Sequence, residues 1–229
     1  MEYDDVGADE DSGQTKVTVR VPLGTRLALT SGLERHQVWT QQMKAHHRRQ
    51  LKGLTPAQRD ILRAEQRQEL DVLRSRGSLL DKRDRLIAFG LRQELQARGW
   101  DRSWWTGVEW EEIPMGLVPA APVSTNPETL SLSLPAMLVE QVRSGCWFSS
   151  RESIRRLRQW RADDTAAVLQ SRKGPPQEEY RRLADGVTTT GEVYRAGIRR
   201  GLQAALHLPT PPVVTGSYRV EGLVSGSVD

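Results

Sequence analysis

Hydrophobic and polar side chains alternate strictly in two short segments of the chain, 16–21 and 129–134, and a proline follows each segment. A period of two is typical of a strand that has one buried and one exposed face. The pattern therefore predicts two half-buried strands. The residues predicted to face inward are Val17, Val19, Val21, Leu130, Leu132 and Leu134. The residues predicted to face outward are Lys16, Thr18, Arg20, Thr129, Ser131 and Ser133.

Helix signals occupy most of the chain between these strands. Thr55-Pro56 places a capping hydroxyl just before a first-turn proline, and the following stretch has no Gly or Pro until Gly77. Asp81 is expected to cap a further helix that runs to about Arg98, with Gly99 as its stop. The sequence thus predicts two helices between the two strands, one that begins at Thr55-Pro56 and one from Asp81 to about Arg98.

The last predicted helix repeats an earlier one. Segment 86–97 returns as 193–204 with Gly, Arg, Leu, Gln and Ala in step. Thr189 and Glu192 have the spacing of a capping box at its start, in which each side chain satisfies a free backbone N–H. Two matching apolar stripes consist of Ile87, Leu91 and Leu95 and of Tyr194, Ile198 and Leu202. The two helices are expected to pack about a pseudo-twofold axis.

This duplication predicts a mainly α fold with one short two-stranded antiparallel β-ribbon, in which the two strands of the same chain pair. A tryptophan-rich stretch from Trp100 to Trp110 is expected to fill the seam between the halves. The expected organisation is an acidic disordered tail (1–13), a first half (14–112), a Pro-rich linker (113–127), a second half (128–208) and a flexible C-terminal tail (209–229).

Charge is concentrated in the body of the chain. The formal net charge is +4, but residues 1–13 carry six acids and no base, and residues 14–208 carry 32 basic against 21 acidic residues. Such an excess suits a polyanion such as DNA. The alternative explanation is codon usage in a GC-rich gene, because 28 of the 33 basic residues are Arg.

Catalytic and metal-binding patterns are missing from the sequence. The four histidines share no metal-like spacing with Cys or carboxylates, and there is no phosphate-cradling glycine loop or nucleophile elbow. We therefore expect no enzymatic activity, no cofactor and no metal. The single cysteine, Cys146, excludes an intrachain disulfide and is expected to fill the core. No apolar run reaches the ~18 residues of a membrane span, so a cytoplasmic protein without a membrane partner is expected.

The order of a strand, a proline and helices, the last of them with a Thr cap and an apolar stripe, resembles the ribbon-helix-helix family of DNA-binding proteins (Arc/MetJ/CopG-type). In that family two copies pair their strands into an antiparallel ribbon that enters the major groove, where outward side chains read base edges. The resemblance implies base reading by Lys16, Thr18, Arg20, Thr129, Ser131 and Ser133. It also implies that the helix start at Thr188, Thr189 and Thr190 holds a DNA phosphate.

Two family-like units in one chain form a tandem ribbon-helix-helix-like pseudo-dimer, with roughly forty additional residues inserted in each half. A competing assignment uses residues 130–160 alone. It places a turn at Ser144-Gly145 and a cap at Ser149 or Ser150, followed by a helix through Ile154 and Leu157. That arrangement resembles the ParD-like antitoxin branch of the family.

The expected function is sequence-specific binding of double-stranded DNA by a transcriptional regulator, with self-association of pseudo-dimers as a further expected contact. One alternative of the same class is a plasmid partition factor, a conjugation (relaxosome) accessory protein or an antitoxin-type DNA-binding factor. An alternative of another class is a helical adaptor or phage-type structural protein, in which the duplication serves assembly and the arginines reflect codon usage.

Overall fold

The computed structural model describes residues 13–101, 125–170 and 175–207, with side chains 163–177 left aside. In chain order its elements are β1 (Gln14–Val21), α1 (Thr25–Gln50), α2 (Pro56–Ser75), α3 (Arg83–Ala97), β2 (Glu128–Pro135), α4 (Ala136–Gln170), α5 (Pro175–Asp185) and α6 (Thr190–His207). The described part of the chain is therefore mainly helical with a two-stranded sheet, as predicted. Apart from Gly13, both predicted tails lie outside the described residues, as does most of the Pro-rich linker.

The two strands pair with each other. β1 and β2 form a two-stranded antiparallel sheet in which Val17 lies opposite Leu132 and Val19 opposite Leu130. Val19 and the three leucines of β2 are buried, and Val17 is half-buried. The predicted pairing and the predicted inward face are both confirmed. The two strands can share one buried face because their apolar residues alternate with the same phase relative to the proline that follows each strand.

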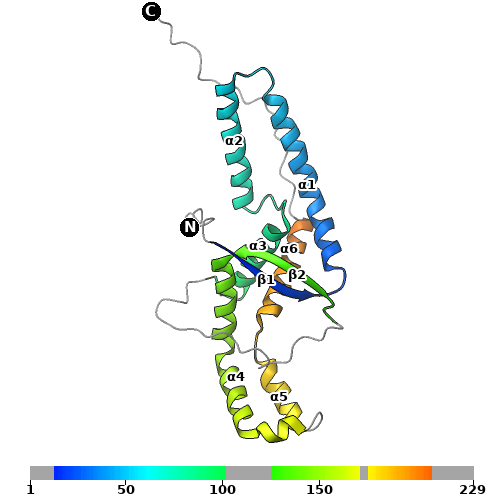
Figure 1. The fold of residues 1–229 in the computed structure, drawn as a ribbon, viewed down its shortest axis with the longest axis vertical. Helices are drawn as coiled ribbons and strands as arrows, with labels where there is room; N and C mark the ends of the chain where they lie inside the picture. The colour runs from blue at the N-terminus through cyan, green and yellow to red at the C-terminus, as the bar shows by residue number, and fades with distance from the viewer. Residues whose placement is uncertain (1–12, 102–124, 171–174, 208–229) are drawn as a thin grey trace, which may run out of the picture.

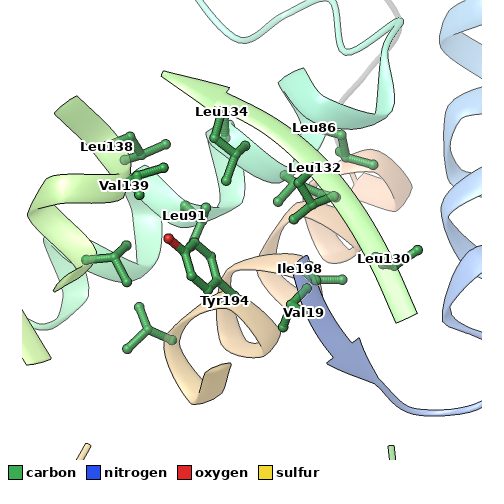
Figure 2. Packing of buried hydrophobic residues seen from close by; sticks show 14 of the residues in the cluster. Val19, Leu86, Leu91, Leu130, Leu132, Leu134, Leu138, Val139, Tyr194 and Ile198 are labelled. Carbon is green, nitrogen blue, oxygen red and sulfur yellow. The ribbon is translucent and has the colours of Figure 1, made fainter. Parts of the chain in front are cut away.

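The apolar face of this ribbon covers α3 and α6, which pack closely against each other. Figure 2 shows Leu134 of β2 extending toward Leu91 of α3 and Leu132 lying beside Leu86 of α3; Leu130, Leu132 and Leu134 all belong to one apolar core with Tyr194 of α6. Leu91 and Ile198 are almost fully buried, so the predicted stripes of both helices lie in the main core. The beginning of α4 completes this core with Leu138 and Val139.

The additional residues of each half form a helical arm. α1 leaves the ribbon and the chain returns along α2, while α4 leaves on the other side and the chain returns along α5, so the arms extend toward opposite ends of the molecule (Figure 1). A small apolar cluster joins α1 to α2 through Trp39, Met43 and Leu70. Ile154 and Leu157 of α4 pack with Val187, and Tyr180 of α5 packs against this cluster.

The competing assignment within residues 130–160 is wrong, because α4 is one continuous helix through both proposed breaks. The hydroxyl of Ser144 donates to the carbonyl oxygen of Glu140, and that of Ser149 donates to the carbonyl oxygen of Cys146 at 3.2 Å. Serines that bond back to the preceding turn remain inside a helix and do not cap a new one.

Asp81 does not cap α3, contrary to the sequence prediction. The helix begins at Arg83, and the residue at its N-cap is Lys82, whose side chain makes no capping hydrogen bond. The Asp81 carboxylate instead accepts from Arg74 at 3.1 Å and from Arg85 at 2.9 Å. The carboxylate binds both guanidinium groups at once, one from the end of α2 and one from α3, and so joins the two helices.

Trp100 and Cys146 both lie in the main core. Trp100 is 5 % exposed, and a Cβ at Gly145 of α4 would overlap its ring. The prediction that aromatic residues fill the seam is confirmed for Trp100, whereas Trp104, Trp105 and Trp110 lie outside the described residues. Burial raises the pKa of the Cys146 thiol to about 12, which agrees with its expected role as a core residue.

Candidate nucleic-acid interface

The outward face of the ribbon brings together all six residues predicted to read bases. They form three cross-strand pairs, in which Lys16 lies opposite Ser133, Thr18 opposite Ser131 and Arg20 opposite Thr129. All are exposed except Ser133, which is half-buried. This face combines two cations on β1 with four hydroxyl groups. Such side chains can donate to and accept from base edges in a major groove.

Gln14 lies on the same face and was missed by the sequence prediction. It is exposed, and its Oε1 accepts a hydrogen bond from Ser133 Oγ at 2.6 Å. The amide group of Gln can recognise adenine through two hydrogen bonds. The alternation of apolar and polar residues gave no signal for Gln14, because Thr15 is polar and the alternation begins only at Lys16.

Arginines hold the outer edges of both strands. On β2, Arg83 Nη2 donates to the carbonyl oxygen of Ser131 at 2.8 Å. On β1, Arg195 Nη1 donates to the carbonyl oxygen of Arg20 at 3.3 Å. Arg83 is the first residue of α3, and Arg195 lies in the second turn of α6, so the N-terminal parts of both helices bond the ribbon. Comparison of the repeated segments cannot reveal this relation, since Arg83 and Arg195 do not occupy equivalent repeat positions.

The start of α6 has the predicted capping box. The amide of Thr189 donates to Glu192 Oε2 at 2.7 Å, and the amide of Glu192 donates to Thr189 Oγ1 at 3.3 Å. The amide of Thr188 donates to Ser150 Oγ of α4 at 2.8 Å. The backbone amides of two of the three residues predicted to contact phosphate, Thr188 and Thr189, therefore already donate to side-chain oxygens. Among the described residues, the amides of Thr190 and Gly191 are the ones left for an incoming anion.

A carboxylate already occupies the start of α1. The residue at the N-cap of this helix is Gly24, with φ 85°, which has no side chain to cap it. Glu128 of β2 takes over this role, with Oε1 accepting from the amide of Gly24 at 2.9 Å and Oε2 from the amide of Arg26 at 3.2 Å. These two hydrogen bonds lower the pKa of Glu128 below its ordinary value. The contact fixes the end of the ribbon to α1.

Within the described ranges there is no group of three or more His, Cys, Asp or Glu residues with the geometry of a metal site. No helix in the same part of the chain is long and apolar enough to span a membrane. Comparison of the chain with protein-family models, curated proteins and solved structures finds no match.

Proposed function

We propose that this chain is a sequence-specific double-stranded DNA-binding protein that regulates transcription. Its fold is interpreted as a tandem ribbon-helix-helix pseudo-dimer. In this interpretation β1, the beginning of α1 and α3 form one copy, and β2, the beginning of α4 and α6 form the other. The two arms are the insertions that separate the first from the second helix of each copy.

The observation that carries the proposal is the ribbon itself. Two strands from distant parts of the chain pair antiparallel, bury their valines and leucines, and leave Lys16, Thr18 and Arg20 exposed opposite hydroxyl side chains. An isolated two-stranded ribbon fits into a major groove, where an outward Arg can bond guanine through two hydrogen bonds. The excess of basic residues in the body of the chain supports a polyanionic partner.

The flanks of the ribbon support the same proposal. The N-terminal parts of α3 and α6 bond opposite strands of the ribbon, through Arg83 in the first turn of α3 and Arg195 in the second turn of α6. The positive end of each helix dipole then lies beside the groove that the ribbon would enter, where the phosphates of a duplex run. Base contacts in the centre and phosphate contacts on both sides are the division of roles expected for sequence-specific binding.

Salt dependence tests the proposal. Fluorescence anisotropy with a labelled random-sequence duplex should give tight binding at about 50 mM salt and a linear fall of log affinity with log salt concentration, because each neutralised phosphate releases counterions. Selection from a random duplex library should then enrich one sequence. No binding at low salt, or an affinity that salt does not change, would contradict the proposal.

The helical adaptor is the second candidate, since one observation favours it. Leu23 and Leu27, at the corner between β1 and α1, are 80 % and 72 % exposed, and exposed apolar side chains of this kind often mark protein contacts. An adaptor predicts little binding to duplex DNA at any salt concentration. The same titration therefore separates the two candidates.

A further inference from the structure

The arm formed by α1 and α2 contains a groove that the ribbon proposal does not use. Its volume is about 400 Å³, and it lies between the outer half of α1 and the middle of α2. The lining residues that are exposed are all cations, whereas the others are buried or half-buried. The cations are Lys44, Arg48, Arg63 and Arg67, and the remaining lining residues are His47, Leu51, Gln66 and Leu70.

The four cations form two facing pairs. Lys44 and Arg48 are four positions apart on α1, and Arg63 and Arg67 are four positions apart on α2, so each pair lies on one helix face. The Nε atom of Arg48 donates to the carbonyl oxygen of Lys44 at 3.3 Å, and that of Arg67 donates to the carbonyl oxygen of Arg63 at 3.2 Å. These bonds use the Nε atoms, and in the described part of the chain no hydrogen bond or ion pair engages the terminal nitrogens of Arg48 or Arg67.

The groove has little negative charge to neutralise these cations. No Asp or Glu is among its lining residues. Arg63 pairs with Asp60 at 3.2 Å on the exposed surface of α2, and the nearby Glu69 lies 3.6 Å from His47. Within the described residues, no carboxylate lies within ion-pairing distance of Arg48 or Arg67. Facing cations without matching acids favour an anionic ligand with several charges, such as consecutive phosphates.

The distance from the ribbon to the groove matches one turn of duplex DNA. α1 begins at Thr25, next to the end of β1, and a rise of 1.5 Å per residue places Lys44 and Arg48 about 28–35 Å further along the helix. One turn of a duplex is about 34 Å. The ribbon crosses the long axis of the molecule obliquely (Figure 1), as a major groove crosses the axis of its duplex. An arm on this axis can run beside the DNA that flanks the ribbon.

We infer that the groove between α1 and α2 binds backbone phosphates of duplex DNA about one turn away from the segment read by the ribbon. This inference rests on the proposed function and extends it, because the arm would enlarge the binding site without reading sequence. Gln66 Nε2 donates to Gln50 Oε1 at 3.0 Å between the two helices, a contact that helps to hold the groove at a fixed width.

The slope of log affinity against log salt, measured on two duplex lengths, tests the inference. The full chain is titrated with random duplexes of about 12 and about 36 base pairs, which are roughly one and three turns long. The slope is compared, and not the affinity itself, because a longer duplex offers more binding positions and so raises the apparent affinity. The slope depends on the number of phosphates that the protein neutralises. The wild-type slope should be steeper on the long duplex. In R48Q/R67Q the slope on the long duplex should fall by about two and the slope on the short duplex should not change.

The matched control is R49Q/R59Q, which removes the same charge from the same two helices outside the groove. Circular dichroism melting of each variant confirms that the arm remains folded.

Wild-type slopes that are equal on both duplexes, or an equal loss in the control, would overturn the inference while leaving the ribbon proposal intact. Failure to bind either duplex would overturn the proposed function itself. Binding of inorganic tripolyphosphate that R48Q/R67Q abolishes, with equal duplex slopes, would assign the groove to a free polyphosphate and would also overturn the inference.

Discussion

Gly90 of α3 and Gly197 of α6 contact each other backbone to backbone, and a Cβ built on Gly90 would overlap the carbonyl oxygen of Gly197. The two glycines occupy equivalent positions of the repeated segments 86–97 and 193–204. Gly201 extends the contact, since a Cβ there would lie 2.6 Å from the carbonyl oxygen of Leu86. The duplication therefore supplies Gly90 and Gly197, the pair that allows the two helices beneath the ribbon to approach closely, whereas the repeat position equivalent to Gly201 is Glu94.

Replacement of Gly90 by alanine should destabilise the protein by roughly 1–3 kcal/mol, because the added methyl group meets backbone and the helices must move apart. The free energy of unfolding, measured by urea titration, checks this. Gly32→Ala in α1 is the matched control, because its Cβ would make an ordinary contact 3.4 Å from Ala205 Cβ. The control should leave stability unchanged or raise it by up to about 1 kcal/mol. Similar losses in both variants would show that close packing is not the cause.

Arg20→Ala should reduce the preference for a selected operator more than it reduces general DNA affinity. An outward Arg that bonds guanine through two hydrogen bonds contributes about 1–3 kcal/mol of discrimination. Affinities for operator and scrambled duplexes give the preference as a ratio. Arg155→Ala, which removes an exposed arginine from α4, should leave that ratio unchanged. Equal losses on both duplexes would make Arg20 a phosphate contact.

Thr189→Ala should lower stability by roughly 0.5–2 kcal/mol through loss of the α6 cap. It should also weaken binding to all short duplexes alike, because the cap orients the free amides of Thr190 and Gly191. Thr55→Ala is the matched control, since Thr55 forms the same capping box with Gln58 at the start of α2. The control should lose stability without losing affinity for a short duplex. If Thr189→Ala binds normally while folded, the start of α6 does not hold phosphate.

Acid should weaken the contact between α3 and α6 at Glu94. Burial raises the pKa of this carboxyl, but hydrogen bonds from Arg200 and Arg98 outweigh burial and lower the pKa below its ordinary value. The ionised carboxylate therefore stabilises the fold above the unfolded-state pKa of 4.5, and this stabilisation is lost as the pH falls through the lower folded-state pKa. Unfolding free energies measured from about pH 6 to pH 3 should fall less steeply in E94Q than in the wild type.

Asp81 and Glu128 also have lowered pKa values and titrate in the same direction. E94Q should therefore reduce the acid dependence of stability and not abolish it. The variant should also be less stable than the wild type at neutral pH, because a neutral amide cannot pair with two guanidinium groups. An unchanged pH profile would show that Glu94 does not contribute to acid unfolding.

The sequence predicted the ribbon because alternation decides which face of a strand is buried, and two strands with the same phase can share one apolar face. It also predicted the cap of α6, since Thr189 and Glu192 bond within one turn. It did not predict the continuity of α4 through Ser144, because whether a serine caps a helix or bonds back within it depends on surroundings that local patterns do not contain.

The interface was predictable only in its centre. The six outward residues follow from the period of the strands, but Arg83 and Arg195 reach the ribbon through the packing of α3 and α6 beneath it. The role of Glu128 likewise depends on the position of Gly24, which is far away in sequence. The phosphate groove requires α1 and α2 to lie side by side, so its cations look like ordinary surface residues when each helix is considered alone.

The pairing of β1 with β2 sets an order of events during synthesis. β1 is made first, and its partner follows more than a hundred residues later. At a synthesis rate of about 5–20 residues per second, the valines of β1 wait roughly 5–25 seconds before their leucine partners leave the ribosome. During that time β1 exposes both its apolar face and the unpaired N–H and C=O groups of its edges. Another nascent chain can pair with such an edge. Two chains made on one message can therefore exchange first strands, and this protein should be prone to domain-swapped dimers when it is produced rapidly.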